Sequence, residues 1–181
     1  MAIAPIDVHD LLGHPGASRR HDVIGTIEGL ATELVAVPDD APVRASLLLE
    51  SVIEGILVTG TIAGTWRLRC ARCLVEWTEP FSIHVQELCT TEERQATADA
   101  DDDLGDDVSM LVDDAIDLEQ LIRDTVGVEM PFAPVHDERC QGLCEICGGN
   151  RNLGECPGHQ AIDPRFAVLS DLLPELPETN D

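Results

Sequence analysis

The alternation of apolar and polar residues predicts a β-rich chain between Val23 and about Cys89. Residues 65–70, Thr-Trp-Arg-Leu-Arg-Cys, alternate with the period of two that is typical of a half-buried strand. The preceding residues 43–64 are rich in β-branched and small side chains, and residues 74–88 continue the strand pattern after a short turn. Because short turns and no helical crossovers separate these segments, we expect an antiparallel meander.

The period changes to that of a helix near residue 117. Apolar or small side chains follow Leu118 at intervals of three, four, seven and eight residues, which predicts a helix over 117–126. Asp117 is placed to cap this helix, with Gln120 in the third position of a capping box. Gly127 is expected to end it.

The two ends of the chain carry weaker signals. Residues 4–22 suggest a short helix or arm, which Gly13 and Pro15 would end. A last helix is expected to begin at Asp163 and Pro164, a cap followed by proline in the first helical position, and to run to Leu173.

Charge narrows the possible functions. The chain has 181 residues, a net charge of −24, and 11 basic residues that are all arginine. Such a chain cannot be a general binder of phosphate backbones, because counterion release requires a basic surface. The acidity suits a basic protein partner, and it could equally serve solubility. The most acidic part is residues 90–124, with a net charge of −11, and the run of acidic residues within 90–107 predicts a solvated loop.

The chain is expected to be cytoplasmic. We find no window of about 18 uncharged apolar residues, which argues against a membrane-spanning helix, and no leader-like N-terminus. Thiols stay reduced in the cytoplasm, where clustered cysteines more often hold a metal ion than form disulfides.

The spacing of cysteine and histidine predicts zinc. Cys144, Cys147, Cys156 and His159 form a Cys-x2-Cys-x8-Cys-x2-His pattern, and two residues between cysteines allow both sulfurs to face one ion. Glycines after Cys147 allow backbone amides to turn toward the thiolates.

Four further candidates, Cys70, Cys73, His136 and Cys140, would form a second site that joins the sheet to the C-terminal segment. Other groupings are also open. One is a ribbon-like site of Cys70, Cys73, Cys144 and Cys147. Another is a single site of Cys140, Cys144, Cys147 and Cys156, which would leave Cys70 and Cys73 free.

The predicted fold is therefore α+β, an antiparallel β-sheet meander with short helices and a C-terminal zinc-binding arm. We divide it into an N-terminal arm over 1–22, a β-rich core over 23–134, and a cysteine-rich zinc arm with the last helix over 135–181. Zinc, as one or two ions, would be structural, since sites closed by four protein ligands leave no open coordination position.

We do not expect an enzyme. A redox pair of Cys70 and Cys73 would normally open a helix after a strand, whereas both flanks here are strand-like. The sequence offers no hydrolytic triad, no phosphate-binding glycine loop and no clear carboxylate pair. The seventh cysteine, Cys89, is interpreted as a small buried hydrophobic residue.

The order of these motifs resembles a known family. Cys-x-Arg-Cys-Leu at 70–74 and Ile-Asp-Leu at 116–118 precede Cys-x-Gly-Leu-Cys-x-x-Cys-Gly at 140–148, and Asp-Pro-Arg-Phe follows at 163–166. Over roughly residues 20–175 the chain resembles the YceD-like large ribosomal RNA subunit accumulation proteins of bacteria and plastids. Relatives commonly have cysteine at the places of the two candidate histidines, which supports the two-site grouping.

The resemblance implies a non-enzymatic role in ribosome biogenesis, in accumulation or processing of large-subunit RNA. A patch of Arg67, Arg69 and Arg72 could contact precursor ribosomal RNA, or the acidic surface could escort a basic ribosomal protein, and charge favours the escort. No membrane contact and no small-molecule substrate are expected. The competing hypotheses are an acidic zinc-bearing adaptor unrelated to ribosomes and a dithiol oxidoreductase.

Overall fold

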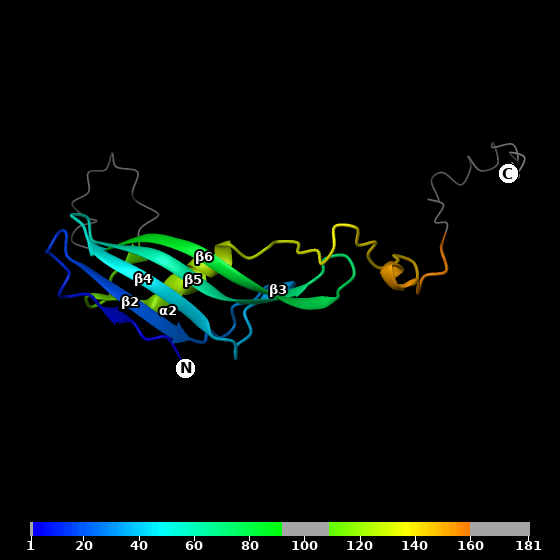
Figure 1. Ribbon diagram of the computed structural model, residues 1–181, viewed down its shortest axis with the longest axis horizontal. Helices are drawn as coiled ribbons and strands as arrows, with labels where there is room; N and C mark the ends of the chain where they lie inside the picture. Colours follow the sequence, from blue (N-terminus) through cyan, green and yellow to red (C-terminus); the bar gives the residue numbers. More distant parts are fainter. Residues whose placement is uncertain (1, 92–108, 160–181) are drawn as a thin grey trace, which may run out of the picture.

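A twisted sheet forms the body of the protein in a computed structural model, which describes residues 2–91 and 109–159 (Figure 1). Its strands lie in the order β2 (Ser18–Gly25), β4 (Val43–Ser51), β5 (Ile56–Arg69), β6 (Glu76–Thr90) and β7 (Ser109–Met110), with β3 (Val35–Ala36) paired to β5. The order β2-β4-β5-β6 is antiparallel throughout, as the sequence predicts. The addition of β7, which is parallel to β6, makes the sheet mixed rather than purely antiparallel.

One α-helix, α2 (Leu118–Val128), packs against this sheet. The carboxylate of Asp117 accepts a hydrogen bond of 3.0 Å from the backbone N–H of Gln120, which confirms the predicted cap. The Gln120 side chain donates to Asp124 instead of reaching back to the cap, so the reciprocal half of the capping box is absent. The helix ends at Val128, one residue beyond Gly127, where the sequence predicted its end.

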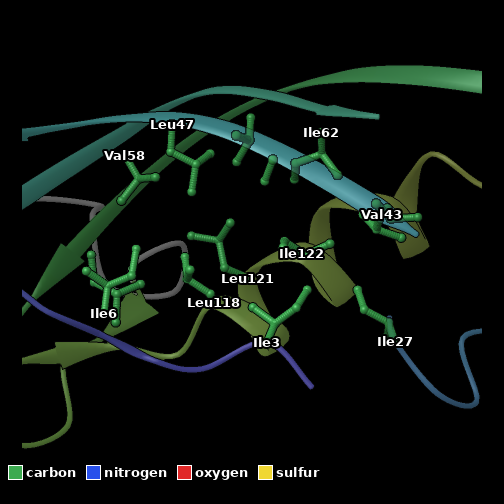
Figure 2. Packing of buried hydrophobic residues seen from close by; sticks show 14 of the residues in the cluster. Ile3, Ile6, Ile27, Val43, Leu47, Val58, Ile62, Leu118, Leu121 and Ile122 are labelled. Carbon is green, nitrogen blue, oxygen red and sulfur yellow. The ribbon is translucent and has the colours of Figure 1, made fainter. Parts of the chain in front are cut away.

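The hydrophobic core lies between α2 and one face of the sheet (Figure 2). Every second residue of β4 is buried from Val43 to Ser51, the burial pattern of a strand with one face in a core. On α2 the buried side chains are Leu118, Leu121, Ile122 and Val126, one helical face. Burial of one face of each strand fixes the register of the long strands, because a shift by one residue would move the apolar side chains to the other face.

The N-terminal segment contributes to this core, which corrects the expectation of a helix or arm at residues 4–22. Ile6 pairs with Ile116 in a second, two-stranded sheet of β1 (Ile6–Asp7) and β8 (Ala115–Ile116). Ile3, Ile6, Val8 and Leu11 are buried. β2 already begins at Ser18, so the proposed boundary after residue 22 falls inside a strand. Long-range pairing and burial outweigh the local helical pattern here.

The long β5–β6 hairpin extends beyond the core and carries the Cys70–Cys73 turn at its tip (Figure 1). The segment after α2 runs back to this tip and contains one short 3-10 helix, η1 (Arg151–Leu153). The acidic loop, apart from residues 90 and 91, and the C-terminal helix predicted from Asp163 lie outside the described residues. No helix within 2–91 or 109–159 has the length and apolarity that a membrane span requires.

Candidate metal centres

Two cysteine turns of matching geometry lie near the far end of the hairpin. In the first, the backbone N–H of Leu74 donates to the carbonyl of Cys70 at 2.9 Å. In the second, the N–H of Gly148 donates to the carbonyl of Cys144 at 2.8 Å. Both donors have a left-handed backbone, with φ of 61° and 70°. Glycine adopts this conformation freely, whereas leucine does so at a cost of about 1 kcal/mol.

The first cluster consists of Cys70, Cys73, His136 and Cys140, whose ligand atoms all lie within 4.8 Å of one another. The two sulfurs of Cys70 and Cys140 are 3.9 Å apart, and Cys73 Sγ lies 3.5 Å from His136 Nδ1. A tetrahedral zinc ion with bonds of about 2.3 Å to sulfur and about 2.0 Å to nitrogen places its ligands about 3.5–3.8 Å apart. The donors therefore fit such an ion.

Backbone hydrogen bonds hold the arm against the hairpin around the first cluster. Ala71 donates to the carbonyl of Pro134 at 2.8 Å, and Leu143 donates to the carbonyl of Arg72 at 2.9 Å. The guanidinium of Arg72 donates in turn to the carbonyl of Cys140 at 3.1 Å. The arginine between the two hairpin cysteines is thus a structural link, a role that the sequence analysis missed.

The second cluster consists of Cys144, Cys147, Cys156 and His159, again with all ligand atoms within 4.8 Å. Its ligands come from one short stretch of the arm. Cys144 is buried, but Cys147 and His159 are exposed. All three cysteines of the first cluster are buried, so the second cluster is the more accessible to solvent.

Asn152 of η1 connects the two clusters. Its side-chain N–H group donates to the sulfur of Cys140 at 3.3 Å, and its side-chain oxygen accepts from the backbone N–H of Gln141 at 2.8 Å. The side chain of Asn150 accepts a hydrogen bond from the backbone N–H of Asn152 and fixes the turn. A hydrogen bond to a ligand sulfur orients that ligand and stabilises its thiolate form. The spacing of cysteines alone gave no signal for this contact.

Each cluster contains one thiol that ionises easily. Burial opposes ionisation of Cys70, but hydrogen bonds involving His136 and nearby backbone groups lower its pKa to about 5. Backbone hydrogen bonds at Cys147 and Ile146 lower the pKa of Cys144 to about 6. Burial raises the pKa of Cys73, with neighbouring thiols adding to the effect. A divalent cation would relieve the repulsion between thiolates and allow the remaining thiols to ionise.

The structure brings all eight predicted residues together in the two groups that the spacing favoured. The two alternative groupings are not the ones that assemble. Cys89 is 1% exposed in the hydrophobic core, and burial raises its pKa to about 12, as fits a small buried residue. That the clusters bind zinc remains a prediction.

The arginine patch expected at residues 67–72 does not exist as a free surface. Arg69 forms an ion pair of 2.7 Å with Glu76, and Arg72 is engaged by backbone carbonyls. Of the three, this leaves only Arg67 without a partner among the described residues.

Comparison with known proteins identifies the family. Residues 58–173 match the model of the large ribosomal RNA subunit accumulation protein YceD. An uncharacterized protein of Mycobacterium tuberculosis is 39% identical over 171 residues, covering 93% of this chain and 80% of the relative. One from Mycobacterium leprae is 33% identical over 183 residues, covering 99% and 83%.

A more distant match is a chloroplast protein of Arabidopsis thaliana, named large ribosomal RNA subunit accumulation protein YCED homolog 1. It is 34% identical over 58 residues, covering 32% of this chain and 18% of that protein. No solved structure matches with significance. The family model spans most of β5, all of β6 and both cysteine clusters, and on this ground the chain belongs to the YceD family.

Proposed function

We propose that this protein is a non-enzymatic, cytoplasmic factor in the biogenesis of the large ribosomal subunit, which supports accumulation or processing of large-subunit RNA. The family match carries the proposal, because it covers the sheet tip, α2 and both clusters together. The name of the family refers to RNA accumulation and to no reaction.

Each cluster is proposed to hold one structural zinc ion. Three thiols and one imidazole per cluster form a donor set that zinc prefers, and four protein ligands leave no position open for a substrate. Zinc in the first cluster would fix the arm to the β5–β6 hairpin. Zinc in the second would fold the arm itself.

The proposed partner is precursor large-subunit RNA or a basic ribosomal protein. The charge of −24 supports a basic protein on most of the surface, because it repels a phosphate backbone. Any contact with RNA must therefore be confined to a region where acidic residues are few.

A depletion strain tests the proposal. We expect loss of the protein to lower the ratio of large- to small-subunit RNA, measured on gels and in sucrose gradients. The parent gene should restore the ratio, as should a Cys89→Ser control, while Cys70→Ser should fail. An unchanged ratio after depletion, together with pulldowns free of ribosomal RNA and protein, would instead support an adaptor unrelated to ribosomes.

A further inference from the structure

The face of the sheet opposite α2 is open among the described residues (Figure 1). Strand register assigns to it the even-numbered residues of β2 (18–24), β4 (44–50) and β6 (76–88) and the odd-numbered residues of β5 (57–69). We call this set the open face. None of its residues is buried, whereas the alternate residues of β4 fill the core.

The open face differs in charge from the rest of the molecule. It carries four arginines against three carboxylates, Asp22, Glu50 and Glu76, while the chain as a whole has 11 basic and 35 acidic residues. Most of its other side chains are neutral, and seven are serine or threonine. An acidic protein therefore presents one broad surface that does not repel a polyanion.

Three arginines of the open face have no ion-pair or hydrogen-bond partner among the described residues: Arg20, Arg44 and Arg67. Elsewhere in that part of the chain most arginines are engaged. Arg19 pairs with Asp10, and Arg123 pairs with Glu119. Guanidinium groups left free in a chain so rich in carboxylates are available for an external anion.

The three free arginines lie on a diagonal across three strands. Arg44 is opposite Ile24 on β2, four residues from Arg20, and opposite Ala63 on β5, four residues from Arg67. The two intervals extend in opposite directions along the strands. With a strand rise of about 3.4 Å and a spacing of about 4.8 Å, neighbouring arginines on this line are about 14 Å apart. Because phosphates follow one another at about 3.4 Å along a stacked strand, that distance places each arginine at a different phosphate.

We infer that the open face binds the sugar-phosphate backbone of large-subunit RNA along the line from Arg20 through Arg44 to Arg67. Arginine and hydroxyl side chains are the groups that contact phosphates and sugars. Apart from the imidazole of His84, the open face carries no aromatic side chain on which a base could stack, so the contact would follow the backbone and not the base sequence. This inference rests on the proposed role with large-subunit RNA and names the surface that performs it.

The carboxylates on the same face set the strength of the contact. Asp22 shares β2 with Arg20 and lies diagonally from Arg44, and Glu50 lies diagonally from Arg20. Both would repel a neighbouring phosphate. Binding should therefore be weak and strongly dependent on salt, which suits a factor that must leave the finished subunit.

Binding of transcribed large-subunit RNA domains to the full chain, followed by fluorescence anisotropy over a salt series, tests the inference. The plot of log K for RNA binding against log salt concentration has a negative slope. Its magnitude should fall by about 0.7 to 0.9, the share of one phosphate contact, in each of the variants Arg20→Gln, Arg44→Gln and Arg67→Gln. Arg139→Gln removes the same charge from an exposed site on the arm and should leave the slope unchanged.

A gain of binding provides the complementary test. Asp22→Asn should raise affinity several-fold at low salt, while Glu145→Gln, an exposed carboxylate on the arm, should change it little. Equal losses from Arg139→Gln and the three face variants would overturn the inference, as would no detectable binding by the parent chain. Crosslinks from this face to a ribosomal protein instead of RNA would also overturn it.

The depletion experiment separates the two proposals. If depletion lowers large-subunit RNA but the face variants bind and complement like the parent, only the assignment of this surface fails. If depletion leaves the RNA ratio unchanged, the proposed function fails with it.

Discussion

The attachment of the arm to the hairpin should depend on the first cluster. Replacing Cys140 by serine removes one of its four ligands and the sulfur that accepts from Asn152. Without metal, the arm keeps four hydrogen bonds to the hairpin, one from Ala71, one from Leu143 and two from Arg72, each worth about 1 kcal/mol. Ordering one residue costs about 1–2 kcal/mol, so these bonds offset only about two to four residues of the arm.

A structural zinc site contributes about 10 kcal/mol or more. Losing even 4 kcal/mol of that would raise the population of released arm by about a thousandfold. Trypsin reports this directly, because Arg139 is exposed and lies between His136 and Cys140 of the first cluster. We expect cleavage after Arg139 to be at least about a hundredfold faster in Cys140→Ser or in chelator-treated parent protein, with the sheet core intact.

Cys89→Ser is the matched control, since it makes the same atomic change at a site in the core. It should lower the melting temperature, because a hydroxyl replaces a thiol that is 1% exposed, but leave the arm as resistant as in the parent. Cleavage of Cys140→Ser at the parent rate would refute the reasoning, as would an arm that stays protected after complete removal of metal.

Three further measurements follow from the structure. Elemental analysis of the purified protein should find two zinc ions per chain, and one zinc ion per chain in Cys156→Ala. If the variant still bound two ions, Cys156 would not be a ligand of the second site. Leu74→Gly should raise the free energy of unfolding by up to about 1 kcal/mol, because it removes a left-handed leucine that is half exposed, and a clear loss in thermal melts would show that its side chain packs after all. A hydrogen bond and the charge of Asp114 raise the pKa of His9 above 6.5, so the contribution of this pair is complete below that pH and disappears as pH rises through the raised value. NMR titration should show this shift and its loss in Asp114→Asn.

Local chemistry was predictable wherever neighbouring residues determine it. The cap at Asp117 and both cysteine turns depend on spacings of two or three residues, which the chain displays directly. The two clusters were also predictable as groups, because each combines pairs whose spacing suits one ion. The N-terminal segment was not, since its local pattern is helical and the pairing of Ile6 with Ile116 is set by distant residues.

Features that depend on strand register could not be obtained from the sequence. Arg20, Arg44 and Arg67 lie on three separate strands, and only the pairing of those strands aligns them on one face. The sequence suggested Arg67 with its neighbours in the chain instead. Asn152 was missed for a related reason, because its contact with Cys140 depends on how the arm folds back on itself.

The ligands of the two clusters are separated by very different lengths of chain, and this difference has a consequence for the order in which the protein folds and binds metal. The second gathers its donors within one short stretch of the chain and can close without the sheet. The first joins sulfurs 70 positions apart and must wait for a finished hairpin. The metal ion of the first cluster would then bind last, and a chain whose sheet is misassembled could not bind it.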